Sequence, residues 1–149
     1  MENTFVFDRI TAEDKDVFID MSREFYASDA VLAPVPENFH TKAFEELMKG
    51  DRYLVGFIIR YGQKAAGYAL LAKSYSREAG GEMLWLDEIY LKGEYRGMGA
   101  AKKFFAFMHE RFSPARFRLE VESDNKRAIA LYEKNGYKVL PYVQMIRDN

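Results

Sequence analysis

A glycine-rich junction between a strand and a helix constrains this chain more than any other part of its sequence. Residues 95–101 read YRGMGAA; an apolar strand ending near Leu91 precedes them, and a helix with apolar periodicity follows. Glycine lets a backbone approach a ligand closely, and the first N–H groups of a helix have no partner within it. With the permanent charge of Arg96, this arrangement predicts a phosphate-binding site. Tight turns also use glycine, so the interpretation depends on a second segment.

The second segment is a strand followed by a short capped helix. Residues 120–137 read EVESDNKRAIALYEKNGY, with a helix-start signal at residues 123–125 and a stop at Asn135-Gly136. Positions i, i+3 and i+7 share one helix face, which aligns an amide, a small side chain and a phenol. These three residues are Asn125, Ala128 and Tyr132.

Together the two segments resemble the GNAT superfamily of acetyl-CoA-dependent N-acyltransferases. The first segment matches the superfamily's arginine-x-x-glycine-x-glycine/alanine signature with Arg96, Gly99 and Ala101. The second matches its asparagine-x-x-alanine-x-x-x-tyrosine helix, which a glycine and an aromatic residue follow. Many members carry glycine where this chain has Ala101, but alanine is an accepted alternative. The resemblance is strongest over residues 84–137, and the element order extends it over the whole chain.

Composition favours one compact domain over residues 1–149. The chain has 48% hydrophobic residues and no linker-like run. A net charge of −1 argues against general nucleic-acid binding, and the absence of cysteine excludes disulfides and thiolate metal sites. His40, expected in a loop, and His109 have no partner at a metal-ligand spacing, so we expect no metal and assign neither a role.

The sequence also carries no membrane or secretion signal. No segment is long and apolar enough to span a bilayer, and the first ten residues lack the charged and apolar regions of a signal peptide. We therefore expect a cytoplasmic protein with no membrane partner, and a homodimer stays open.

Apolar patterning predicts the element order β-α-α-β-β-β-α-β-α-β. The expected strands span residues 4–10, 53–60, 64–74, 82–92, 116–122 and 137–146. The expected helices span residues 11–26, 41–49 and 99–112, with a last one beginning at Asn125, and loops are expected over residues 27–40 and 75–81. A hairpin turning at residues 61–63 precedes helical crossovers, so the sheet must be mixed. This predicts an α/β (α+β) fold with helices on both faces of a mixed, mostly antiparallel sheet.

The resemblance implies where acetyl-CoA would bind as cosubstrate. In the superfamily, the strands corresponding to residues 82–92 and 116–122 splay apart around the thioester. The pantetheine arm pairs with one strand, and the pyrophosphate lies on the glycine loop. The expected cofactor-binding residues are Ile89, Tyr90, Leu91, Arg96, Gly97, Met98, Gly99, Ala100, Ala101, Asn125, Ala128 and Tyr132.

Acetyl transfer to an amine requires a base, because an alkylammonium has a pKa near ~10 and cannot attack while protonated. Asp87 and Glu88 end the strand beside the opening. Neighbours on a regular strand point to opposite faces, so one of them would face the substrate unless a bulge re-aims the other. Relatives that use a glutamate base carry it on this strand. Either carboxylate, or water, is a candidate base, and either could instead neutralise a neighbour.

Tyr132 is the candidate general acid. Its phenol, with an ordinary pKa near ~10, could protonate the departing CoA thiolate, whose ordinary pKa is nearer ~8.5. An isolated tyrosine on an amphipathic helix would be a core residue, but the register with Asn125 and Ala128 favours the catalytic interpretation. A backbone N–H near residues 89–91 would stabilise the oxyanion.

Acceptor specificity is expected in the irregular segments 25–40 and 75–81, because loops generally carry specificity. Phe25, Tyr26 and Asp29 are the candidate acceptor-binding residues, with ordinary packing at a helix end as the alternative. Acidic side chains expected nearby would favour a cationic amine; they are Asp29, Glu37, Asp87 and Glu88.

Several functions remain open at this level. The predicted activity is acetyl transfer to a primary amine of a small cationic molecule. Polyamines, aminoglycosides, amino acids and peptide N-termini are all possible acceptors. The alternatives are a protein or peptide N-acetyltransferase and a non-catalytic sensor that binds acetyl-CoA.

Overall fold

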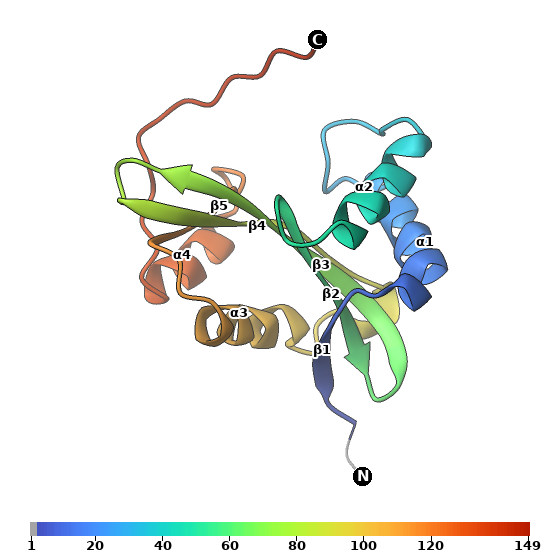
Figure 1. The fold of residues 1–149 in the computed structure, drawn as a ribbon. Coiled ribbons are helices and arrows are strands. Elements are labelled where there is room, and N and C mark those ends of the chain that lie inside the picture. The colour runs from blue at the N-terminus through green and yellow to red at the C-terminus, as the bar shows by residue number, and fades with distance from the viewer. Residues whose placement is uncertain (1–2) are drawn as a thin grey trace. The chain divides into compact units, whose positions relative to one another are not determined.

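The computed structural model describes residues 3–149, which form two compact units (Figure 1). The first unit ends at Leu119, and the second spans Glu120–Asn149. The strands of the first unit are β1 (Phe5–Arg9), β2 (Leu54–Tyr61), β3 (Lys64–Ser76), β4 (Gly81–Leu91) and β5 (Arg116–Leu119). Its helices are α1 (Lys15–Tyr26), α2 (Asn38–Met48) and α3 (Ala100–Arg111), with 3₁₀ turns η1 (Ala12–Asp14) and η2 (Gly93–Tyr95). The second unit contains α4 (Lys126–Lys134). The prediction of one domain over residues 1–149 stays a prediction.

The sheet is mixed and mostly antiparallel, as predicted. Its strand order is β1-β2-β3-β4-β5. The first three pairings are antiparallel, and β4 pairs with β5 in parallel through the helical crossover α3. The predicted hairpin of β2 and β3 is confirmed, with Tyr61 opposite Lys64 at its turn. The α/β class is therefore confirmed.

Alternate residues of the central strands pack into two apolar cores, one on each face of the sheet. Ile58 and Leu70 pack on one face with residues of α1 and α2. Phe57 and Ile59 pack on the other face with Phe104 of α3. This division follows from the period-two alternation of side chains along a strand. The predicted placement of helices on both faces is confirmed within the first unit, as Figure 1 shows.

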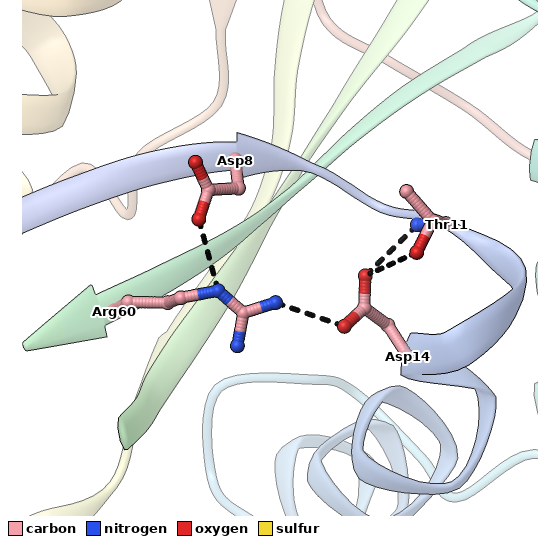
Figure 2. A network of polar contacts seen from close by, with 4 residues as sticks. All are labelled: Asp8, Thr11, Asp14 and Arg60. Atoms are coloured by element: carbon pink, nitrogen blue, oxygen red, sulfur yellow. Dashed lines mark hydrogen bonds and ion pairs between the residues drawn. The ribbon is translucent and has the colours of Figure 1, made fainter. Parts of the chain in front are cut away.

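A polar network fixes the start of α1 against the sheet (Figure 2). The guanidinium of Arg60 on β2 donates to Asp8 and to Asp14, each at 2.9 Å. The other oxygen of the Asp14 carboxylate accepts from the backbone N–H of Thr11 at 2.9 Å. Asp14 is only 7% exposed, and these partners supply hydrogen bonds that offset the cost of its burial. The network joins β1, β2 and the first turn before α1, where the sequence predicted a helix start.

The predicted strand over residues 137–146 is wrong. The structure forms no strand after β5 within residues 3–149. The apolar side chains of this segment are exposed; Val143 is 89% and Met145 90% accessible. β-branched and aromatic residues favour a strand only when a neighbouring strand supplies hydrogen bonds and a packing surface. The segment has the composition of a strand but makes no such pairing.

Other helices and strands begin or end a few residues away from their predicted positions. α2 begins at Asn38, three residues before the predicted start, and therefore contains His40, which was predicted to lie in a loop. The N–H of Phe39 donates to the carbonyl of Pro36 at 2.9 Å, so the turn that leads into α2 begins before Asn38. β5 ends at Leu119, so the predicted strand residues 120–122 are not part of it. The predicted loop 75–81 shortens to residues 77–80, because β3 extends to Ser76 and β4 begins at Gly81.

Within residues 3–149, no helix combines the length and the apolar character needed to cross a membrane.

Candidate functional site

A β-bulge lies where the two candidate carboxylates occur on β4. Leu70 of β3 pairs with Glu88, but the next residue, Leu71, pairs with Leu86. Asp87 is therefore the extra residue of the bulge. Asp87 is exposed, whereas Glu88 is half-buried and lies opposite Leu70 on the α1 and α2 side of the sheet. The bulge changes the alternation of β4 at this point and separates the environments of the two carboxylates.

The same strand has one edge free of strand partners beyond the bulge. β5 pairs with β4 only from Met83 to Leu86. From Glu88 to Leu91, β4 pairs with β3 alone among the strands in residues 3–149. The backbone groups that face away from β3 are therefore available to an extended ligand, which would add to the sheet like a strand. The pairing of β4 with β5 ends where β5 itself ends, at Leu119, and the predicted splay of these strands stays a prediction.

The Glu88 carboxylate is held by two tyrosine hydroxyls. Tyr26 at the end of α1 donates to one oxygen at 2.8 Å, and Tyr68 on β3 donates to the other at 2.7 Å. Tyr68 is fully buried and packs on Phe18 of α1, with ring centroids 5.2 Å apart. Both carboxylate oxygens are thus fixed by groups whose own positions are set by packing.

Burial raises the pKa of Glu88, and the charge of Asp87 raises it further. The two hydrogen bonds from Tyr68 and Tyr26 oppose this effect because they stabilise the ionised form. Burial also raises the pKa of both tyrosines above the ordinary phenol value, so they stay protonated as donors. The arrangement keeps a carboxylate in a position to accept a proton and gives it a pKa nearer to neutrality than usual.

Glu88 lines a cavity of about 400 Å³ between the sheet and the two N-terminal helices. This volume lies toward the small end of the range of roughly 300–1,000 Å³ for small-molecule sites. The lining residues are Phe18, Ser22, Tyr26, Val35, Phe39, His40, Lys42, Ala43, Leu70 and Glu88. All of them belong to the first unit.

The predicted acceptor-binding residues lie in different environments. Tyr26 lines the cavity and contacts Glu88. Phe25 is 9% exposed and packs in the core against Tyr68, with ring centroids 6.2 Å apart. Asp29 is exposed and is not among the lining residues, and Glu37 forms an ion pair with Arg23. Of the four acidic residues expected around the acceptor, only Glu88 lines the cavity.

Sequence reasoning missed some residues that line the cavity and one that contacts Glu88 from the core. Tyr68 contacts Glu88, and Ser22 hydrogen-bonds the buried ring of His40 at 2.7 Å. The His40 ring in turn lies 5.8 Å from the Tyr26 ring. The helical spacing of Ser22 and Tyr26, four residues apart on α1, was the available signal for a shared face. Nothing local in the sequence indicated that residues of β3 and α2 meet there.

The glycine loop has the geometry of an anion site. Gly97 and Gly99 adopt φ values of +77° and +82°, in the left-handed region that glycine tolerates best. A Cβ at either position would meet no protein atom within 4 Å, so space beside the backbone is open. The first backbone bond of α3 runs from the N–H of Lys103 to the carbonyl of Gly99 at 3.0 Å. The N–H groups of residues 100–102 consequently have no partner inside the helix.

The neighbouring predicted residues connect this loop to β4. Arg96 donates to the carbonyl of Leu91 at 3.0 Å, and its guanidinium lies 6.0 Å from the centre of the Tyr90 ring. The Tyr90 hydroxyl donates to Glu24 of α1, and burial raises the pKa of Tyr90 to about 12. The other predicted residues lie nearby: Ile89 is near the end of β4, Met98 lies in the loop, and Ala100 and Ala101 begin α3. These features fit a pyrophosphate on the loop and a pantetheine arm along β4.

The second unit carries the remaining predicted residues. The side chain of Asn125 caps α4 by accepting from the backbone N–H of Ala128 at 3.2 Å. The helix ends at the predicted Asn135-Gly136 stop, with Gly136 at a φ of +89°. The Tyr132 ring lies 6.1 Å from the ring of Tyr137, and burial raises the Tyr132 pKa. Asn125, Ala128 and Tyr132 share a helix face by their spacing, as predicted.

No cluster of histidine and carboxylate side chains that could hold a metal ion occurs in residues 3–149.

Comparison with known proteins matches residues 17–137 to the family described as "Acetyltransferase (GNAT) family". No curated protein sequence is significantly similar to this chain. A solved structure described as a possible acetyltransferase from Clostridium difficile 630 is 18% identical, with a TM-score of 0.78 and 97% of each chain covered.

Two further solved structures share the fold. The aminoglycoside N-acetyltransferase AAC(6')-Iy in complex with CoA is 15% identical, with a TM-score of 0.74, covering 99% of this chain and 97% of that one. The ribosomal-protein-alanine N-acetyltransferase from Brucella melitensis biovar Abortus 2308 is 19% identical, with a TM-score of 0.71, covering 97% of this chain and 100% of that one. At these identities the likeness shows the fold alone.

Proposed function

Because the chain belongs to the GNAT acetyltransferase family, we propose that it transfers an acetyl group from acetyl-CoA to a primary amine of a small cationic molecule. Family membership supports an acyltransferase; the donor, the acceptor and the roles of individual residues are part of the proposal. The observation that carries it is the Glu88 carboxylate, held by Tyr26 and Tyr68 in a cavity beside the unpaired edge of β4.

In this proposal Glu88 is the base. The ammonium of the acceptor lies against its carboxylate, which takes one proton and leaves a neutral amine that can attack a carbonyl carbon. Glu88 is preferred to Asp87 because it lines the cavity, whereas Asp87 is the exposed residue of the bulge. The raised pKa of Glu88 supports the role, because a base is most effective when its pKa approaches the working pH.

The glycine loop and β4 hold acetyl-CoA, whose thioester supplies the activated acetyl group. The N–H groups at the start of α3 face the pyrophosphate, and the backbone of Ile89 to Leu91 pairs with the pantetheine arm. Open space beside Gly97 and Gly99 supports this placement. A backbone N–H of the same stretch of β4 stabilises the negative charge that develops on the carbonyl oxygen.

Tyr132 is the proposed donor to the departing sulfur. Ordinary pKa values place full transfer from a phenol to a thiolate uphill by about 1.5 units, and burial raises the phenol pKa further. Tyr132 therefore donates as the carbon–sulfur bond breaks, and the proton lost by the phenol is replaced from the proton that the amine releases. The ammonium loses two protons in all: Glu88 passes the first to solvent, and the second, released as the amide forms, replaces the proton that Tyr132 gives to the CoA thiol.

Release of free CoA thiol in the presence of a panel of amines tests the proposal. The panel contains monoamines, polyamines, aminoglycosides, amino acids and a peptide N-terminus, and each reaction is compared with acetyl-CoA alone. We expect amine-dependent thiol release that falls at least tenfold in Glu88→Gln. The matched control is Glu82→Gln, an exposed carboxylate on the same strand, which should leave the rate unchanged.

The other outcomes identify the alternatives. Binding of acetyl-CoA with no amine-dependent thiol release would indicate a non-catalytic sensor. Release with the peptide alone would indicate a protein or peptide N-acetyltransferase. Both results would contradict the proposed small-molecule activity.

A further inference from the structure

The acceptor cavity is lined mainly by apolar side chains and contains one carboxylate and one ammonium group. Phe18, Val35, Phe39 and Leu70 supply much of its apolar lining. Among the lining residues, Glu88 is the acidic one and Lys42 is the basic one. A site of this kind binds the body of a ligand by apolar contact and uses its few polar groups to fix orientation.

The two charges occupy different depths. The Glu88 carboxylate is bonded to Tyr68, which is fully buried. Lys42 is exposed on α2, and its ammonium lies 5.2 Å from the centre of the Phe39 ring, which is 46% exposed. The acidic lining residue is therefore more buried than the basic one.

Among the surrounding acidic residues, Asp87 acts on Glu88 at the same place, and the others add no second anionic subsite. Glu37 is engaged by Arg23, and Asp29 does not line the cavity. Within residues 3–149, no ion pair joins Lys42 to a carboxylate. A polycation that placed one ammonium on Glu88 would bring its other charges toward Lys42, where like charges repel.

We infer that the acceptor is a primary amine on an apolar body with an anionic group at its far end, the amine on Glu88 and the anion facing Lys42. This inference rests on the proposed acetyl transfer and revises its acceptor from a net-cationic molecule to a zwitterionic one. Polyamines and aminoglycosides are poor acceptors in this inference, because their further ammonium groups would lie near Lys42, the basic residue of the cavity lining. The similarity to an aminoglycoside N-acetyltransferase lies in the fold and does not extend to these lining charges.

Three probes with the same ring test the inference. They are para-(aminomethyl)benzoate, benzylamine and para-xylylenediamine, whose far ends are anionic, neutral and cationic. We expect kcat/KM and affinity to fall in that order, by about fivefold from first to last, the size expected for a partly exposed charge pair. Calorimetry measures binding of the same probes independently of turnover.

A variant that reverses the charge of residue 42 tests the inference most directly. Lys42→Glu should reverse the order, so that the diamine becomes the best of the three probes. Lys49→Glu, the same change on an exposed residue that ends the same helix and does not line the cavity, should keep the wild-type order. Circular dichroism of both variants checks that the overall helix content is unchanged.

The outcomes separate this inference from the proposed function. If the diamine or spermidine is acetylated best by the wild type, or if Lys42→Glu leaves the order unchanged, the inference is wrong while acetyl transfer stands. If the binding order and its Lys42→Glu reversal hold without any turnover, the inferred ligand chemistry of the cavity stands and the proposed acetyl transfer is wrong. If the probes show neither the expected order of binding nor any turnover, the inference and the proposed function are both wrong.

Discussion

At the scale of single residues, Glu88 is a carboxylate kept partly out of water by packing and kept usable by two hydroxyl donors. Burial raises its pKa, whereas the bonds from Tyr68 and Tyr26 lower it. These effects predict different responses to different substitutions. Removing the charge should relieve the cost of burial, and removing a donor should increase that cost.

Glu88→Gln should raise the melting temperature at neutral pH. The folded-state pKa of Glu88 lies above its unfolded value, so folding favours the protonated form and stability falls as pH rises through the folded pKa. A neutral amide of similar shape avoids this loss and can still bond both tyrosines. Thermal unfolding at acidic and neutral pH should show the gain only at neutral pH. An equal or lower melting temperature at neutral pH would show that the buried charge carries no cost.

Tyr68→Phe should move the acidic limb of the kcat/KM profile to higher pH. The hydroxyl donates to ionised Glu88, so its loss raises the pKa of the carboxylate and delays formation of the base. A pH–rate series with a confirmed acceptor measures the shift. Tyr75→Phe on the same strand is the control, because Tyr75 is 71% exposed. An unmoved acidic limb would mean that a group other than Glu88 controls it.

Tyr132→Phe should leave acetyl-CoA affinity nearly unchanged and reduce turnover on the order of 10²-fold, the usual contribution of a positioned acid. The substitution keeps the ring, which packs near Tyr137. Single-turnover measurement ensures that chemistry limits the observed rate. Wild-type turnover would show that Tyr132 is a packing residue, and a parallel loss of cofactor binding would show a structural role for its hydroxyl.

Part of the site could be predicted from sequence because its signals are local. Glu88 follows an apolar strand, and Tyr26 ends a periodic helix. The hydrogen-bond partners of this carboxylate were harder to predict from sequence, because Tyr68 is 20 residues and Tyr26 is 62 residues away along the chain. The bulge at Asp87 was foreseen only as a possibility, because it depends on the pairing of β4 with β3. Tertiary pairing, which no local pattern encodes, supplied the environment of the carboxylate.

At the scale of elements, the loop from η2 to α3 is where sequence and structure agree most closely. The predicted glycines adopt the left-handed conformation at Gly97 and Gly99 and leave the helix start open. The hairpin and the first two helices were also predictable from periodicity and turn residues. The final strand was not, because strand composition does not by itself provide a pairing partner for residues 137–146.

Gly99→Ala should weaken the stabilisation that acetyl-CoA provides. The left-handed φ of +82° costs an alanine about 1–2 kcal/mol, so the loop would shift or bind less well. Gly93→Ala is the matched control, because that glycine has no positive φ and its Cβ would also meet no atom within 4 Å. Thermal shifts with increasing acetyl-CoA compare the two variants. Equal shifts would contradict the placement of the cofactor on this loop.

At the scale of the whole molecule, the proposed reaction assigns roles to both compact units. The base and the acceptor cavity belong to residues before Glu120, and the proposed acid lies on α4 in residues 120–149. Substitutions in the two units therefore test separate steps. Changes at Glu88 should alter the pH dependence of attack, and changes at Tyr132 should alter departure of the thiol.

The pH dependence of amine-dependent thiol release in the wild type, Glu88→Gln and Asp87→Asn tests most directly the claim that an acetyl group moves to an amine held on Glu88. We predict that Glu88→Gln loses most activity near neutrality and recovers partly at high pH, where free amine is abundant. Asp87→Asn should mainly change KM or stability. Equal, small effects of both substitutions would contradict the account, because water would then accept the proton.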